Sequence, residues 1–166
     1  MGNRTVKVIM VAVLGLAVGA GFAFAGSWPA DVVKKVEEFK LLKRDKKEMP
    51  ATIEGITIIT AEELKSWLDQ KKKFTIIDNR PVEEFAIEHI PEAKRLDAED
   101  LYKDPKLADA FNKEDITVNY CNGVMCWRSP AMTVMLKSLG FKNVYWFRDG
   151  VPVWAKKGFP TAEGKE

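Results

Sequence analysis

The chain has 166 residues, which is enough for one ordinary domain and a short extension. Its 26 basic and 24 acidic side chains give a formal net charge of +2, and two of the bases, Arg4 and Lys7, precede every acid in the chain. A body with nearly balanced charge does not fit the strongly basic class of nucleic-acid-binding proteins, so we expect no nucleic acid as a partner.

Residues 1–25 have the organisation of a secretory signal peptide. A short basic start precedes an uncharged, apolar run over 8–25, and Ala23-Phe24-Ala25 fits the small-x-small cleavage pattern. Membrane attachment through residues 8–25 is the alternative, because the run approaches the roughly 20 residues that span a bilayer. Either way we expect the body to be exported, into the periplasm if the source is a Gram-negative bacterium. A disulfide between the two cysteines is then chemically allowed.

Residues 26–50 predict one amphipathic helix followed by a charged linker. Apolar side chains recur there at helical spacing among many lysines, and residues 43–48 are charged up to Pro50. We expect this segment to pack on the following domain as an extension. Docking on a membrane surface is the alternative, although the acidic residues of the segment dilute its basic face.

Strand and helix patterns alternate from residue 51 onward. Short apolar runs at residues 56–59 and 74–78 predict strands, and the capping box Thr60-Ala61-Glu62-Glu63 predicts the start of a helix between them. Further along we expect a short helix over 82–89, a short strand at Leu96 and a helical stretch over 97–112 that is broken near Pro105.

The next stretch is organised around Cys121 and Cys126, the only cysteines in the chain. A β-branched run over 116–120 predicts a buried strand before them, and apolar spacing over 131–139 predicts a helix after them. Ser129 is the expected cap of that helix. A helix amino terminus that faces the loop favours a thiolate or an anion there.

A last strand over 143–147 and a terminal helix over 151–157 complete the pattern. Gly140 stands where the preceding helix should stop, because glycine often follows the last helical residue. Strands alternate with helices throughout, so the sequence predicts an α/β fold with a parallel sheet.

Several ordered motifs resemble those of rhodanese-like domains. Asp78-Asn79-Arg80, Glu84-Phe85 and residues 89–93 are similar to the first family signature, and Arg128-Ser129, residues 140–144 and residues 150–160 are similar to the second half. The resemblance covers about residues 56 to 162 and places the domain at 51–162. It implies a three-layer domain, with a central parallel sheet flanked by helices, and sulfur transfer through a cysteine persulfide.

The loop departs from the family pattern. The usual sulfurtransferase loop is Cys-x4-Arg and the related phosphatases use Cys-x5-Arg, whereas Cys121 to Arg128 is Cys-x6-Arg. The flanking strand and helix keep the family register, so two extra residues lie inside the loop, where Cys126-Trp127 is unusual. A subset of secreted rhodanese-like proteins carries such a Cys-Trp pair after an earlier cysteine, and this chain resembles them.

We predict that Cys121 is the nucleophile, held ionised and reachable at the end of the strand. Arg128 is predicted to bind an anionic donor such as thiosulfate, and the alternative is a salt bridge to an acid under the loop. Cys126 fits three roles: resolving a persulfide on Cys121 through an internal disulfide, holding a permanent disulfide, or serving as the reactive thiol itself. The remaining loop residues are assigned to substrate binding: Asn122, Gly123, Trp127 and Ser129.

The only histidine, His89, is assigned with Asp78 and Arg80 to ordering the structure, as the family resemblance implies. One histidine and two cysteines make no obvious zinc site, so we expect neither a metal nor a cofactor.

The sequence therefore predicts an exported, monomeric sulfurtransferase or persulfide carrier. Its partners would be a small sulfane-sulfur donor and a thiol acceptor. Two alternatives on the same loop stay open: a dithiol–disulfide redox protein that uses Cys121 and Cys126, and a non-catalytic binding module.

Overall fold

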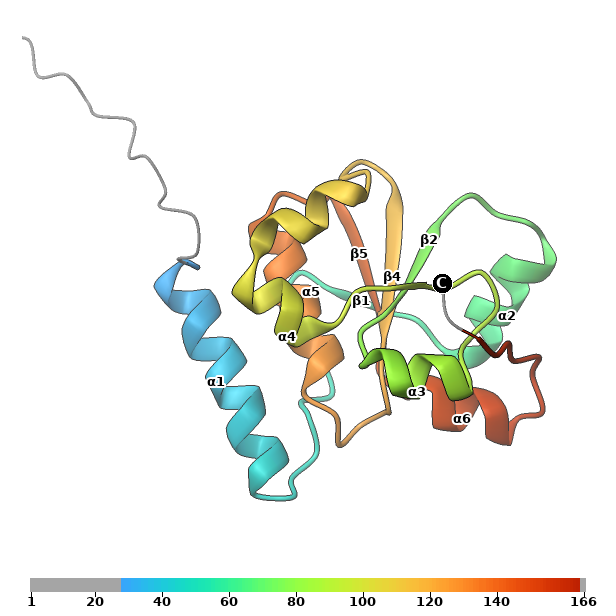
Figure 1. Cartoon of the computed structure of the whole chain (residues 1–166), viewed down its shortest axis with the longest axis horizontal. Coiled ribbons are helices and arrows are strands. Elements are labelled where there is room, and N and C mark those ends of the chain that lie inside the picture. The colour runs from blue at the N-terminus through green and yellow to red at the C-terminus, as the bar shows by residue number, and fades with distance from the viewer. Residues whose placement is uncertain (1–27, 165–166) are drawn as a thin grey trace, which may run out of the picture.

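A central sheet of five parallel strands, in the order β1-β5-β4-β2-β3, organises the computed structural model, which describes residues 28–164. β4, the strand before the two cysteines, lies in the middle of the sheet between β2 and β5 (Figure 1). The strands are β1 (Thr57–Ile58), β2 (Thr75–Asp78), β3 (Lys94–Arg95), β4 (Ile116–Tyr120) and β5 (Asn143–Phe147). The predicted parallel α/β sheet is confirmed. The predicted leader lies outside the described residues.

Helices cover both faces of the sheet, which gives the three layers expected from the family resemblance. In Figure 1, α1, α4 and α5 lie on one side of the strands, and α2, α3 and α6 lie on the other. Within residues 28–164, no helix combines the length and the apolar character that crossing a membrane requires. The helices are α1 (Ala30–Arg44), α2 (Ala61–Asp69), α3 (Val82–Ile87), α4 (Ala98–Lys103), the 3-10 helix η1 (Pro105–Ala110), α5 (Arg128–Ser138) and α6 (Gly150–Lys156).

The amphipathic segment before the domain forms α1 and contributes to the first core. Val36 and Phe39 are almost fully buried in the cluster that also holds the apolar side chains of α4 and α5. Trp28 fixes the start of the helix, because its ring stacks on Tyr102 with centroids 6.4 Å apart and its Nε1 donates to the Tyr102 carbonyl at 2.8 Å. Residues 28–44 are therefore part of the packed fold.

Local sequence signals locate most element boundaries. Thr60 and Glu63 form the predicted capping box at the start of α2, with Thr60 N donating to the Glu63 carboxylate at 2.9 Å. The third strand ends before Leu96, and the stretch after it divides into α4 and η1 at Pro105, which supplies no N–H to continue a helix.

The prediction that Ser129 caps α5 is wrong. The helix begins at Arg128, the capping position is Trp127, and no side chain makes a capping hydrogen bond there. Ser129 lies inside the first turn with no exposed surface, and its hydroxyl accepts a 2.9 Å hydrogen bond from Nε1 of Trp146. The hydroxyl therefore points toward the sheet, where the buried indole needs an acceptor.

Truncating Phe39 to alanine tests whether α1 belongs to the cooperative fold. The substitution should lower the free energy of unfolding by about 3–5 kcal/mol, because it opens a cavity between α1 and the sheet. Chemical denaturation would measure it. Leu41→Ala on the same helix is the control, since Leu41 is 47% exposed and should cost less than about 0.5 kcal/mol. Equal, small effects would mean that α1 is only loosely attached.

Candidate functional site

The cysteine loop, residues 121–127, connects β4 to α5 and is fixed by the turn that follows β5. Val151 N donates to the Cys121 carbonyl at 3.0 Å. Gly123 and Gly150 have φ angles of +87° and +65°, and a Cβ on Gly123 would come within 2.8 Å of the Asp149 carbonyl oxygen. A Cβ on Gly150 would collide with the Cys121 carbonyl. Two glycines thus allow two backbones to touch.

The Cys121 thiol differs from the sequence prediction in its exposure and in its pKa. Its side chain is fully buried, and burial raises the pKa of its thiol well above the ordinary value. Sγ lies 3.0 Å from Ser129 Oγ and accepts a 3.4 Å hydrogen bond from Ser129 N. The end of β4 directs this thiol inward, beneath the first turn of α5, so the expectation of an ionised and reachable sulfur at position 121 is wrong.

Cys126 is the thiol of the pair whose pKa is lowered, and it is buried too, with 5% of its surface exposed. A hydrogen bond from the Cys121 thiol is the largest influence that lowers the pKa of Cys126 to about 6. The backbone N–H groups of Arg128 and Asn122 and the charge of the Arg128 guanidinium lower it further, against the effect of burial. Both cysteines are free thiols. At neutral pH, Cys126 therefore holds the thiolate and Cys121 keeps its proton.

Arg128 makes the salt bridge that stood as its alternative role. Its Nη2 lies 3.1 Å from Oε1 of Glu99 in the first turn of α4, and its side chain is 20% exposed. Its Nε is buried and has no hydrogen-bond partner among the described residues. The nearby Asp97 has a pKa that burial raises. Glu99 carries no sequence signal for this role, because helix periodicity does not reveal a contact across 29 residues.

A buried ion pair at the end of β2 is hydrogen-bonded to the cysteine loop. Arg80 binds Asp78 through two groups, Nε to Oδ1 at 2.9 Å and Nη2 to Oδ2 at 2.6 Å, and both side chains are buried. Nη1 of Arg80 also donates to Oδ1 of Asn122 at 3.3 Å, and the Asn122 amide donates to the Glu84 carboxylate. Asn122 is thereby oriented by α3 and by Arg80.

His89 makes contacts that belong to the scaffold. Its Nδ1 lies 2.9 Å from the carbonyl oxygen of Phe85, and its ring stacks on the Phe85 ring with centroids 3.8 Å apart. Its backbone pairs with Ala162 near the end of the described chain. These contacts tie α3 to the C-terminal segment.

Trp127 and Ser129 frame the cysteine loop from two sides. Trp127 is 7% exposed and packs in the first core beside α1, with Lys40 Nζ 5.2 Å and Arg128 Cζ 5.7 Å from its ring centroid. Ser129 has no exposed surface, and its Oγ lies 3.0 Å from Cys121 Sγ. Ser129 therefore packs against the buried thiol, whereas Trp127 lines a surface hollow.

Sequence reasoning missed a strap formed by residues 48–50. Met49 N donates to the carbonyl of Val124 in the cysteine loop at 2.8 Å, and Met49 is 1% exposed. Arg148 holds the strap, because it donates to the carbonyls of Pro50 and Met49 at 3.0 and 2.7 Å and pairs with Glu48 at 3.2 Å. These partners lie about a hundred positions apart, so no local pattern reveals them.

Within residues 28–164, no group of three or more His, Cys, Asp or Glu side chains is arranged to hold a metal ion. The arrangement instead offers one low-pKa thiolate, one buried thiol that donates to it, and one arginine beside them. Such a set can attack an electrophilic sulfur and hold the product anion.

Comparison with known proteins identifies relatives for most of the domain. A family model described as rhodanese-like domain matches residues 60–157. A Mycobacterium tuberculosis protein named probable adenylyltransferase/sulfurtransferase MoeZ is 32% identical over 103 residues, which cover 61% of this chain and 25% of that protein. The HTH-type transcriptional regulator Rv0324 of the same species is 33% identical over 90 residues, 54% of this chain and 38% of that protein. The chain thus spans well under half of either relative.

A solved structure agrees with the fold. The crystal structure of a rhodanese-like domain protein from Staphylococcus aureus is 30% identical and superposes with a TM-score of 0.53, covering 60% of this chain and 91% of that one.

The different states of the two thiols predict different alkylation profiles. Cys126 should react with iodoacetamide with a pH midpoint near 6, and Cys121 should react slowly at neutral pH. Cys121→Ala removes the largest cause of the low pKa, so the Cys126 midpoint should rise toward about 8.5. Peptide mass spectrometry after timed labelling would measure both. Labelling of Cys121 before Cys126 at pH 7 would contradict the assignment.

Proposed function

The chain belongs to the rhodanese-like domain family, and on that premise we propose that it is a sulfurtransferase or sulfur carrier that holds sulfane sulfur on Cys126. The observation that carries this proposal is the Cys126 thiolate, whose pKa is lowered to about 6 by the Cys121 thiol and by loop N–H groups. The word sulfurtransferase in the name of the MoeZ relative supports the reaction class.

The reaction has two balanced steps. With thiosulfate as donor, the Cys126 thiolate attacks the outer sulfur, the S–S bond of the donor breaks, and sulfite leaves with the electron pair. Cys126 then carries a persulfide anion. In the second step the thiolate of an acceptor attacks the outer sulfur, takes it as a new persulfide, and releases Cys126 as the thiolate.

The loop favours the anions on this path. The N–H groups of Arg128 and Asn122 and the guanidinium of Arg128 stabilise the negative sulfur in each form. The Glu99 carboxylate occupies Nη2 of Arg128 at 3.1 Å, so an anionic donor competes with Glu99 for that arginine. Cys121 keeps its proton and orients the Cys126 sulfur by hydrogen bonding.

A second candidate function uses both thiols as a redox pair. It is favoured by the free, hydrogen-bonded state of the two sulfurs. Here the Cys121 sulfur attacks Sγ of a Cys126 persulfide, the S–S bond of the persulfide breaks, and hydrosulfide leaves. An internal disulfide remains, and an external dithiol must reduce it before the next cycle.

We place this chemistry outside the cytoplasm, as the leader-like residues 1–25 suggest, and we propose that the protein works as a monomer. Mass measurement of the exported protein would test leader removal: a chain that begins at Gly26 supports a cleaved signal peptide, and an intact residue 1 supports an anchor.

Persulfide loading separates the two thiols. After exposure to thiosulfate or polysulfide, the protein should gain the mass of one sulfur atom, located on the peptide with Cys126. Cys126→Ser should abolish this gain, whereas Cys121→Ala should keep it at neutral pH with slower loading, because less of the Cys126 thiol is ionised. Intact-mass spectrometry without reductant measures both. A stable gain on Cys121 in the Cys126→Ser variant would contradict the proposal.

The redox alternative predicts a different product. After loading and incubation without an acceptor, it yields hydrosulfide and a protein with a Cys121–Cys126 disulfide that dithiothreitol reduces. Sulfur transfer instead yields a stable persulfide that passes to an added thiol. A protein that neither loads sulfur nor forms a reducible disulfide would be a binding module.

A further inference from the structure

We propose that a hollow bordered by Trp127 of the cysteine loop binds a small organic thiol or persulfide that carries carboxylates, and that Lys40 of α1 selects for it. The inference rests on the proposed function, because it names the class of sulfur compound that would exchange with Cys126. It adds a contribution from a helix that lies outside the residues matched by the family model, 60–157.

The hollow lies where α1, α4 and the cysteine loop meet. It has a volume of about 300 Å³, and its lining residues are Lys40, Glu99, Tyr102, Lys103 and Trp127. Trp127 directly follows Cys126, so the Cα atoms of the two residues lie about 3.8 Å apart. Glu99 is the partner of Arg128. The hollow is therefore lined by the residue that follows Cys126 and by the carboxylate that pairs with Arg128.

Cations dominate the lining of the hollow. Lys40 Nζ lies 4.6 Å from the centroid of the Tyr102 ring and 5.2 Å from that of Trp127. Its partner Glu37, at 2.9 Å, is itself half exposed. Lys103 makes no ion pair within the described part of the chain, and the one acid of the lining, Glu99, already pairs with Arg128. Added carboxylates would therefore compete with the half-exposed Glu37 for Lys40, and with no ion-pair partner in the described part of the chain for Lys103.

The lining suits an organic ligand better than a bare inorganic anion. Two aromatic rings form walls that give apolar contact, and the volume lies at the lower end of the range for organic-ligand pockets. A thiol that carries carboxylates fits both features, because its carbon skeleton packs on Trp127 and Tyr102 while its charges meet Lys40 and Lys103.

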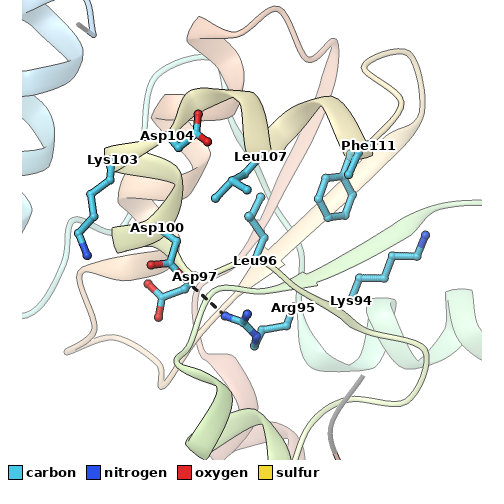
Figure 2. A pocket seen from close by; sticks show the side chains of 10 residues that line it. Lys94, Arg95, Leu96, Asp97, Asp100, Lys103, Asp104, Leu107 and Phe111 are labelled. Atoms are coloured by element: carbon cyan, nitrogen blue, oxygen red, sulfur yellow. Dashed lines mark ion pairs between the residues drawn. The ribbon is translucent and has the colours of Figure 1, made fainter. Parts of the chain in front are cut away.

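A larger neighbouring hollow fits this role less well. It has a volume of about 600 Å³ and lies between β3 and the α4–η1 segment, and Figure 2 shows Leu96, Leu107 and Phe111 on its apolar side. Acids and bases share its charged side, where Arg95 and Asp100 lie 3.9 Å apart. None of its lining residues belongs to the cysteine loop. Lys103 borders both hollows and projects from the side of α4 that faces α1 (Figure 2).

Binding of S-methylglutathione, an unreactive thioether with two carboxylates, tests the inference without any turnover. Lys40→Gln and Lys103→Gln should each weaken its binding to the full chain about fivefold, the size expected for one partly exposed ion pair. Lys43→Gln is the matched control, because Lys43 lies on the same helix outside the hollow and should leave binding unchanged. Isothermal titration calorimetry at low salt measures the three affinities.

An esterified ligand tests whether the carboxylates are what the hollow recognises. The diethyl ester of S-methylglutathione should bind more weakly and respond equally little to all three substitutions. Binding of the free acid that Lys40→Gln and Lys103→Gln do not weaken, or that Lys43→Gln weakens as much, would overturn the inference.

Transfer to 2-mercaptoethanol separates this outcome from failure of the proposed function. The Cys126 persulfide should pass to this uncharged thiol in the unchanged protein, and at the same rate in Lys43→Gln, whose side chain lies outside the hollow. Absence of that transfer in the unchanged protein would contradict the proposed function, while the titrations would still decide whether the hollow binds carboxylates.

Discussion

The coupling between the protonation states of the two thiols is the interaction on which the chemistry of this protein depends. Two sulfurs that share one buried loop cannot both be charged, because burial opposes each charge and the two anions would repel each other. The proton stays on Cys121, which lies deeper, and the charge stays on Cys126, which is closer to the N–H groups and to Arg128. The inner thiol thus keeps its proton and lowers the pKa of the outer one, while its Sγ lies 3.0 Å from Ser129 Oγ and 3.7 Å from the Cys126 carbonyl oxygen.

This division of charge requires a loop whose backbone cannot relax. Gly123 and Gly150 let the loop and the turn after β5 touch, and the Val151 amide holds the Cys121 carbonyl. From the other side, the strap at Met49 binds Val124 and is held by Arg148. The helix α1 therefore belongs to the same unit as the thiols. The strap that follows α1 contacts the cysteine loop, and Trp127 of that loop packs in the same core cluster as the buried side chains of α1.

Local patterns were enough to predict the fold, but not the state of the site. The capping box at Thr60, the run before Cys121 and the apolar spacing of α1 depend on neighbours in sequence, and each predicted element is present. Which thiol is ionised depends on where the chain after β4 places the Cys121 side chain. It also depends on where two backbone N–H groups point. Arg128 contacts Glu99, and Arg148 contacts the strap, only once the chain is folded, because the partners lie far apart in the sequence. Residue spacing therefore does not predict these contacts.

The two extra loop residues give a physical reason for the reversal of roles. Both thiols lie near the amino end of α5, because Ser129 N donates to Cys121 Sγ at 3.4 Å. Here Cys126 stands two residues before Arg128 and receives its N–H, while Cys121 remains at the strand end beneath Ser129. A helix amino terminus stabilises the nearest anion most strongly, because its partial charge falls off within one turn. The longer loop therefore provides a second thiol position, Cys126, that holds the thiolate, while Cys121 stays buried and protonated at the strand end.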